Sequence, residues 1–275
     1  MPSTQRSTMT AIEWTDRTWN PVTGCDRTSP GCDNCYAMVM AKRLKAMGQP
    51  RYQNDGDPRT SGPGFGVTCH ADVVGQPLRW RKPSMVFVNS MSDLFHGQVP
   101  LSFIGDVWRT MAAAPQHTFQ VITKRAKRMN VELGWEVERA QIYGNGNSFV
   151  VGDPDNGYKP LPNVWLGVSV ESDRYTFRAE YLRETPAAVR FISAEPLLGP
   201  LPSLDLNGID WVIIGAESGH GARPMSNDWI LEIIEKADAA GCAVFVKQLS
   251  GGTHAVKDMA QFPLASLRRR EYPQA

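Results

Sequence analysis

The feature that most constrains the fold of this chain is an alternation of short apolar runs with amphipathic segments between residues 85 and 247. The runs are rich in Val, Ile and Phe, which is typical of buried strands. They are Met85–Asn89, Thr118–Thr123, Val164–Val170, Val189–Ser193, Trp211–Gly215 and Ala243–Lys247. Residues 100–113 and 229–240 carry apolar side chains at helical spacing, and Gly241 stands where the second helix would end. This alternation predicts a parallel sheet covered by helices.

A further strand is predicted near Trp19–Thr23, which brings the number of strands to about seven. That number favours an α/β fold with a parallel-sheet, open or partial TIM-type (β/α) barrel, and a doubly wound sheet is the alternative. With 275 residues, 42% of them hydrophobic, the chain can bury one such core.

The predicted domain organisation is a flexible tail at residues 1–11, a single α/β domain at residues 12–250 and a C-terminal extension at residues 251–275. Segments near residues 53–66 and 143–162 are rich in Gly, Asn, Asp and Pro. Both are expected to be loop insertions in the domain.

Charge and hydropathy restrict the function classes. The chain has 29 basic and 28 acidic side chains, so any nucleic-acid or membrane binding would need a local patch. The N-terminus is polar, which argues against a secretory signal, and no apolar run reaches the roughly 18–20 residues that span a bilayer. We therefore expect a cytoplasmic protein without a membrane partner.

Polar side chains follow nearly every predicted strand. They are Ser90, Asp93 and His96 after the first, then Lys124 and Arg125, Ser169 and Glu171, Ser193 and Glu195, Glu217 after Gly215, and Lys247. In parallel α/β folds the carboxyl ends of the strands hold the active site. Any one of these residues could be polar only because a strand end meets solvent, but the same behaviour at six strands favours a common site.

Three of the five cysteines, Cys25, Cys32 and Cys35, stand in a C-x6-C-x2-C pattern. An odd number of cysteines is a poor disulfide framework, and thiolates select zinc, copper(I) or iron–sulfur clusters. Three ligands leave one iron of a [4Fe–4S] cluster open, whereas a closed zinc site needs four. A zinc site completed by Cys69, His70 or another histidine is the alternative.

A set of motifs in a fixed order carries a family resemblance. It begins with the segment around the three cysteines and continues with FVNSMSDLFH, TFQVITKR, NVWLGVSVE, RFISAEPLLGPL, IDWVIIGAESG and FVKQ, covering about residues 12–248. Together they resemble an uncharacterised phage and bacterial family of three-cysteine-motif proteins that is radical S-adenosylmethionine (SAM)-like. The chain departs from the family at Ala216, where a second glycine is more common, and at Leu249-Ser250, where Trp-Gly is more common.

The resemblance implies a fold of the radical SAM type and an enzyme that uses a [4Fe–4S] cluster and SAM. Cys25, Cys32 and Cys35 would hold the cluster, and SAM would be cleaved to a 5′-deoxyadenosyl radical that abstracts hydrogen from an unknown substrate. A reductant such as flavodoxin or ferredoxin is then an expected partner.

The resemblance also suggests roles for the residues that follow the strands. Ser90 and Asp93 are expected to hold the SAM amino group, Ser169 and Glu171 the ribose, and Gly215 and Glu217 the adenine. Glu195, His96 and Lys247 are the candidate catalytic residues, although Glu195 could instead form a buried ion pair with Arg223, Lys124 or Lys247.

Two basic runs, residues 79–82 and 124–128, suggest a nucleic-acid or nucleotide substrate. The candidate contacts are Arg79, Arg81, Lys124, Arg125 and Arg128, and the plain alternative is a solvated helix end. Two other functions stay open: a zinc-stabilised, non-catalytic nucleic-acid-binding protein, and an iron–sulfur protein for electron transfer or redox sensing.

Overall fold

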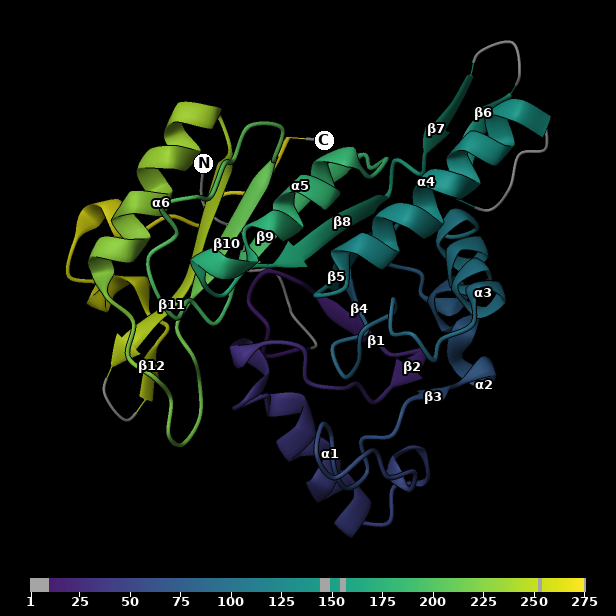
Figure 1. Ribbon diagram of the computed structural model, residues 1–275, viewed down its shortest axis with the longest axis horizontal. Helices are drawn as coiled ribbons and strands as arrows, with labels where there is room; N and C mark the ends of the chain where they lie inside the picture. The colour runs from purple at the N-terminus through teal and green to yellow at the C-terminus, as the bar shows by residue number, and fades with distance from the viewer. Residues whose placement is uncertain (1–9, 144–148, 154–156, 252–253, 275) are drawn as a thin grey trace.

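The centre of the molecule is an eight-stranded sheet with the order β1-β4-β5-β8-β9-β10-β11-β12 (Figure 1). The computed structural model describes residues 10–143, 149–153, 157–251 and 254–274. The strands are β1 (Arg17–Trp19), β4 (Met85–Val88), β5 (Thr118–Thr123), β8 (Val164–Ser169), β9 (Val189–Ala194), β10 (Trp211–Gly215), β11 (Ala243–Gly251) and β12 (His254–Val256). Neighbours from β1 to β11 pair in parallel, and β12 pairs antiparallel with β11.

The strands follow one another across the sheet in chain order, so every crossover moves in the same direction. The helices between them are α2 (Ala71–Val74), α3 (Leu101–Ala112), α4 (Ala126–Tyr143), α5 (Phe177–Glu184) and α6 (Asn227–Ala240). Figure 1 shows α3 to α6 side by side along the sheet. Right-handed crossovers in one direction place helices on one face, as in a barrel, whereas a doubly wound sheet reverses its order. The parallel α/β prediction is confirmed and the doubly wound alternative is wrong.

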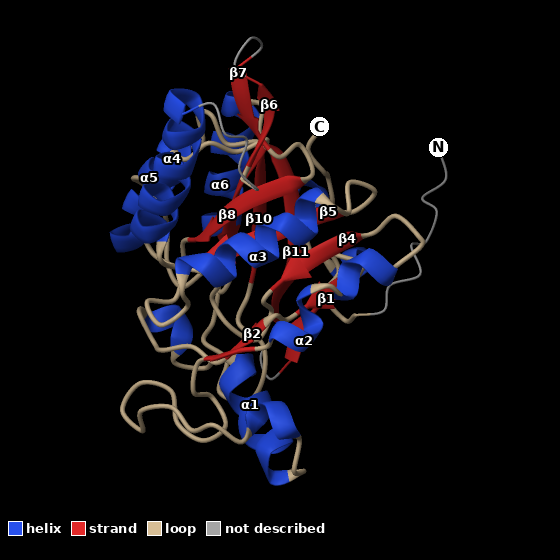
Figure 2. Ribbon diagram, turned by 90° about the vertical axis from the view of Figure 1, so that its right-hand side faces the viewer, coloured by secondary structure: helices blue, strands red, loops and turns tan. Residues whose placement is uncertain are grey.

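The barrel stays open. Among the described residues, β1 and β12 are the edge strands and do not pair with each other. Figure 2 shows the sheet curving between the helices on one side and the N-terminal segments on the other.

Both faces of the sheet are buried, which explains the continuous apolar runs in the sequence. Successive side chains of a strand point to opposite faces. In β10, Val212 and Ile214 pack in the large core with α6, whereas Trp211 and Ile213 join a second cluster with Phe191 and Phe245. The second cluster fills the concave face of the sheet.

Segments from both ends of the chain close the base of this concave face. The centroid of the Trp14 ring lies 6.3 Å from the centroid of the Trp211 ring, and the centroid of the Tyr272 ring lies 5.3 Å from it. Farther back in the C-terminal segment, Phe262 and Leu267 are buried in the large core. The C-terminal segment is therefore anchored to the body of the domain through Phe262, Leu267 and Tyr272.

The three-cysteine segment connects β1 to the rest of the fold. The short strand β2 (Val22–Thr23) pairs antiparallel with β3 (Thr68–Cys69), and helix α1 (Tyr36–Ala46) follows the cysteines. In both ribbon views α1 lies beyond the sheet at the lower side of the molecule (Figures 1 and 2). The segment at residues 53–66 forms turns beside it.

Several boundaries differ from those expected from sequence. Helix α6 begins at Asn227, two residues early, because the Ser226 side chain caps it by accepting from the Asp228 amide. Within residues 143–162, expected as a loop insertion, the described part contains a hairpin of β6 (Val150–Asp153) and β7 (Gly157–Pro160). Residues 144–148 and 154–156 of that segment, and residues 1–9 of the expected tail, lie outside the described residues. Among the helices described, none combines the length and hydropathy needed to cross a bilayer.

Candidate functional site

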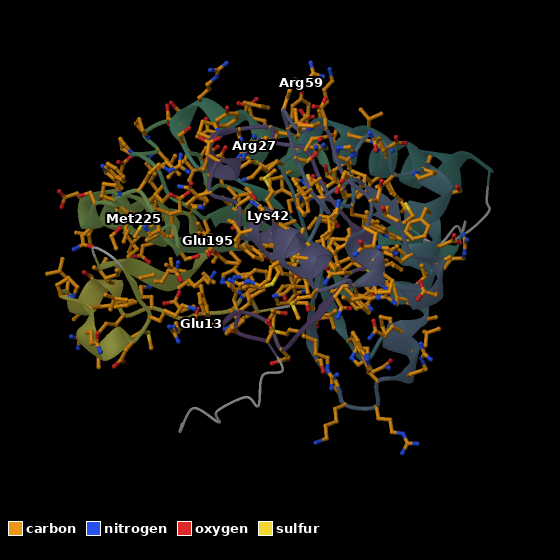
Figure 3. The ribbon with its side chains drawn as sticks, turned by 90° about the horizontal axis from the view of Figure 1, so that it is seen from below. Glu13, Arg27, Lys42, Arg59, Glu195 and Met225 are labelled. Carbon is orange, nitrogen blue, oxygen red and sulfur yellow. The ribbon has the colours of Figure 1, made fainter. Side chains whose placement is uncertain are left out.

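A cavity of about 240 Å³ lies at the carboxyl ends of the parallel strands. Its apolar wall comes from Ile12, Trp14, Phe87 and Ile122. The site residues predicted from sequence that line it are Cys25, Cys32, Cys35, Ser90, Asp93, Lys124, Arg125, Ser169, Glu195, Glu217 and Lys247. Figure 3 views the molecule from the α1 side, with Glu195 labelled. The structure therefore brings most of the predicted site residues together around one cavity.

The three thiols enter this cavity from one loop. Cys35 caps the N-terminus of α1, where burial raises its pKa more than the amides of Met38 and Ala37 lower it. Burial also raises the pKa of the Cys25 thiol to about 12, and Asp93 adds to the rise. Arg125 opposes it, because its Nη1 donates to Cys25 Sγ at 3.3 Å. Helix amides and a guanidinium thus face the positions where thiolates would form.

These residues fit an iron–sulfur cluster better than a closed zinc site. The cavity lining holds three soft sulfur donors and no histidine. Cys69 lies on β3 outside the lining, and Cys242 is buried in the large core. Among the described residues, no three Cys, His, Asp or Glu side chains are grouped closely enough to hold a single metal ion.

Asp93 positions Arg125. Its Oδ1 accepts from the Phe95 amide at 3.0 Å and the Thr123 hydroxyl at 2.7 Å, and its Oδ2 accepts from the Lys124 amide at 3.2 Å and Arg125 Nη1 at 2.9 Å. A carboxylate has about four acceptor positions, so all are engaged within the protein. Asp93 thereby connects the loop after β4 to the end of β5.

Glu171 supports the cysteine loop from beneath. It is fully buried, and its Oε2 accepts from Arg178 Nη1 at 3.0 Å and Lys124 Nζ at 3.3 Å. Although burial acts to raise it, these two cations hold the pKa of Glu171 below its usual value. A Cβ on Gly31 would come within 3.2 Å of the Glu171 side chain, so this loop glycine packs directly on the carboxylate. Glu171 lies outside the cavity lining.

Glu217 and Arg223 clamp the other side of the cysteine loop. Glu217 Oε2 accepts from Asn34 Nδ2 at 2.8 Å, and Arg223 donates to both carboxylate oxygens. Arg223 Nη2 also donates to the Pro30 carbonyl at 2.9 Å. Burial acts to raise the pKa of Glu217, but the Arg223 and Asn34 hydrogen bonds hold it below its usual value. The loop is thereby tied to the end of β10.

Glu195 forms an ion pair with Lys247 inside the cavity. Of the three cations that the sequence offered as partners, Lys247 is the one in contact. Gly215 lies next to this pair and outside the lining: a Cβ there would come within 3.3 Å of the Glu195 side chain. The small residue at position 215 therefore leaves room for Glu195.

Two serines at the strand ends have hydroxyls available to a ligand. Ser169 and Ser193 occupy the same register position on β8 and β9, and both are buried and line the cavity. Within the described part of the chain, neither hydroxyl hydrogen-bonds to protein. The Ser90 hydroxyl, by contrast, donates to Asn20 Oδ1 at 3.2 Å, and the Ser90 carbonyl accepts from Tyr36.

His96 lies behind the cavity rather than in its lining. Its Nδ1 accepts from the Gln98 amide at 3.2 Å, so Nε2 carries the proton and donates to Asp26 Oδ2 at 2.9 Å. Burial and Arg125 lower the pKa of His96, and Asp26 only partly offsets this. A neutral His96 thus orients Asp26, which does line the cavity.

The two basic runs occupy different places. Arg79 and Arg81 are exposed at the start of β4, at the opposite end of the sheet from the cavity. Lys124 and Arg125 are engaged by Glu171 and Asp93. Arg128 donates to the carbonyls of Phe95, His96 and Val99. Lys124, Arg125 and Arg128 of the second run are therefore engaged in ion pairs and hydrogen bonds within the protein.

Sequence reasoning missed two residues of this site, Asp26 and Arg178. Asp26 adjoins Cys25, which was an available signal. Ser193, at the end of its apolar run, and Tyr36, beside Cys35, both line the cavity. The local sequence does not point to Arg178, because its pairing with Glu171 depends on how α5 packs against β8.

Gly24, which precedes the first cysteine, provides a test of loop geometry. Its φ is +86°, and a Cβ would stand 2.2 Å from the Gly66 carbonyl oxygen. We expect Gly24→Ala to destabilise the protein by about 3 kcal/mol or more, from left-handed strain plus the clash, and to lower metal binding. Urea unfolding and metal analysis would measure both effects.

Gly48→Ala is the matched control. Its φ is +73°, but nothing lies within 4 Å of the position that the added methyl group would take. Only the conformational cost of about 1–2 kcal/mol is expected, with unchanged metal binding. Equal losses for the two variants would contradict the close approach at Gly24.

The fold and the site define an α/β protein with an open, mostly parallel sheet and a three-cysteine cavity at the strand ends. The chain belongs to the family described as "Protein of unknown function (DUF5131)", whose model matches residues 9–270. This agrees with the resemblance to an uncharacterised family. No curated protein matches the chain in sequence.

The chain is also similar to solved structures of spore photoproduct lyase. One has 11% identity and a TM-score of 0.41, covering 94% of this chain and 71% of that one. Another, described with bound AdoMet and a dinucleoside spore photoproduct, has 11% identity and a TM-score of 0.39, covering 94% and 72%. The function has to be inferred from the site itself.

Proposed function

We propose that this protein is a radical SAM enzyme in which Cys25, Cys32 and Cys35 hold a [4Fe–4S] cluster. The observation that carries the proposal is the set of three thiols, without a fourth sulfur or a histidine, lining one cavity at the carboxyl ends of the strands. Three ligands leave a cluster iron open to a small molecule, and this end of a parallel α/β fold holds active sites. When bound, the cluster and SAM supply a 5′-deoxyadenosyl radical for hydrogen abstraction.

The cavity offers the protein groups that such a cofactor pair needs. The hydroxyl of Ser169 is available for the SAM ribose, and Ser193 stands beside it. Ser90 and Glu217 also line the cavity. Ser90 is our candidate for the SAM amino group, and Glu217, after Gly215, is our candidate for the adenine side. Asp93 and Glu171 act indirectly in this proposal, since their carboxylates hold Arg125 and Lys124.

The Glu195–Lys247 pair is the candidate for proton handling next to the substrate. A carboxylate and an ammonium in contact can hold or pass a proton within the pair. The apolar wall of Trp14, Phe87 and Ile122 limits water at the base of the cavity. Radical chemistry requires such shielding, because water and side reactions compete for reactive intermediates. His96 contributes through its contact with Asp26.

The test is anaerobic. The protein is reconstituted with iron and sulfide, reduced with dithionite and given SAM, and 5′-deoxyadenosine is measured by mass spectrometry. The proposal expects product from the parent and none from Cys32→Ala. Absence of product in a parent that holds about one zinc and no iron would instead favour a structural zinc protein. A loaded iron cluster that does not cleave SAM would favour electron transfer or redox sensing.

A further inference from the structure

Helix α1 exposes an apolar face to solvent. Tyr36, Val39, Met40 and Met47 have exposed fractions of 51%, 62%, 40% and 66%. The opposite face, through Ala37 and Ala41, is buried against the cysteine segment. Residues spaced by three, four and seven positions share one side of a helix, so these side chains form an apolar strip in which the exposed Arg43 lies between Met40 and Met47. We name this strip, with Lys42 and Arg43, the α1 surface.

The α1 surface is positively charged. The segment 36–47 carries three basic residues and no acidic one. Lys45 is neutralised by Asp55, whereas Lys42 and Arg43 are exposed and form no ion pair within the described residues. Figure 3 shows Lys42 and Arg27 labelled on this side of the molecule. Arg27, on the cysteine loop, is exposed as well.

The same helix adjoins the three-cysteine site. Cys35 is its N-cap and Tyr36 its first residue, and both line the cavity. The α1 surface is therefore an outer covering of the wall that holds the thiols. The Tyr36 end of the α1 surface therefore adjoins Cys35.

We propose that the α1 surface is the docking site for a small acidic one-electron carrier protein. The inference rests on the proposed function, because a cluster that cleaves SAM must first receive one electron. The exposed aliphatic and methionine side chains with a basic rim suit a protein interface, in which Met and Arg are enriched. The positive charge attracts an acidic partner and speeds its association. A nucleic acid would call for stacking side chains, and the single aromatic ring here, Tyr36, is held through its hydroxyl to Ser90.

The transfer is balanced by one electron. The carrier loses one electron and the cluster changes from the 2+ to the 1+ state, with no atom or group moved. For a flavin carrier, the anionic hydroquinone becomes the neutral semiquinone by losing one electron, and no proton is exchanged. No further co-reactant is required.

The experiment uses the full chain with its cluster reconstituted and an acidic bacterial flavodoxin as the probe. The test variant is Lys42→Glu/Arg43→Glu, and the matched control is Arg79→Glu/Arg81→Glu, which reverses two exposed charges at the far end of the sheet. Flavodoxin affinity is measured by calorimetry at low and moderate salt. Cluster reduction is followed by electron paramagnetic resonance, with either flavodoxin hydroquinone or dithionite as the donor.

We expect the test variant to lose flavodoxin affinity and reduction rate by on the order of tenfold at low salt, while the control keeps both. Both variants should be reduced by dithionite at the parental rate. Unchanged flavodoxin binding and reduction in the test variant would overturn the docking site and leave the proposed function standing. A parent that dithionite reduces but that does not cleave SAM would instead remove the proposed function. Loss of oligonucleotide binding with intact flavodoxin reduction would reassign the surface to nucleic acid.

Discussion

Replacing Cys25, Cys32 or Cys35 with alanine, one at a time, is expected to lower bound iron from about four atoms per chain to near zero. In the proposed site each of the three thiols that line the cavity would supply one ligand, so a single substitution would leave two to hold a cluster. The measurement is iron and acid-labile sulfide after anaerobic reconstitution. Cys69→Ala and Cys242→Ala are the controls, since neither thiol lines the cavity, and both should bind iron like the parent.

Cluster binding by the three thiols should also depend on pH, in a direction that the thiol pKa values define. Thiols must lose their protons to bind metal, and burial raises the pKa of Cys25 to about 12. Cluster assembly should therefore release protons and become more favourable as the pH rises. A Cys32→Ala variant that kept its full iron and sulfide content would rule out the three-thiolate site.

Glu171→Ala is expected to be the most destabilising single change near the site, at about 3–5 kcal/mol. The substitution leaves Arg178, which is 2% exposed, as a buried cation without its carboxylate partner. It also removes the partner of Lys124 and the support beneath Gly31. Urea unfolding measures the loss, and Glu184→Ala on the exposed side of α5 is the control. A loss below about 1 kcal/mol would mean that the network contributes little.

Acid should weaken the Glu171 network in a predictable direction. The pKa of Glu171 in the folded protein lies below the usual 4.5. Its contribution to the free energy of unfolding is therefore present above that pH and is lost as the pH falls through the folded value. Glu171→Gln should be less stable than the parent at neutral pH and lose less stability on acidification. Identical pH profiles for the two proteins would contradict the pairing.

The strands could be predicted because burial on both faces makes them continuous apolar runs. Thr118–Thr123 and Trp211–Gly215 were predicted with the bounds that the structure has. The hairpin β6–β7 could not be predicted, because its segment of the sequence is rich in Gly, Asn, Asp and Pro, which favour turns. Helix α4, with 18 residues, has a mixed pattern that gives weak helical periodicity.

The place of the site could be predicted from the cysteines and the polar strand ends, whereas the pairings within it could not. Nothing in the sequence around Asp93 indicates that its four acceptor positions are filled by residues 95–125. Nor does the basic run at residues 124–128 show that its charges are consumed by internal partners. Such contacts depend on which strand ends become neighbours, a property of the sheet order rather than of local pattern.

The clamp on the cysteine loop has a consequence for the order of events during synthesis. Asn34 contacts Glu217, 183 residues later, and Pro30 contacts Arg223, 193 residues later. The cysteines therefore leave the ribosome long before the residues that fix their loop. Contacts of such sequence separation form late, because they close a large loop. A nascent chain that ends before β10 would lack the Glu217–Arg223 clamp on the cysteine loop. Insertion of the proposed cluster is therefore expected after translation, when β10 and the residues that follow it have folded against the loop.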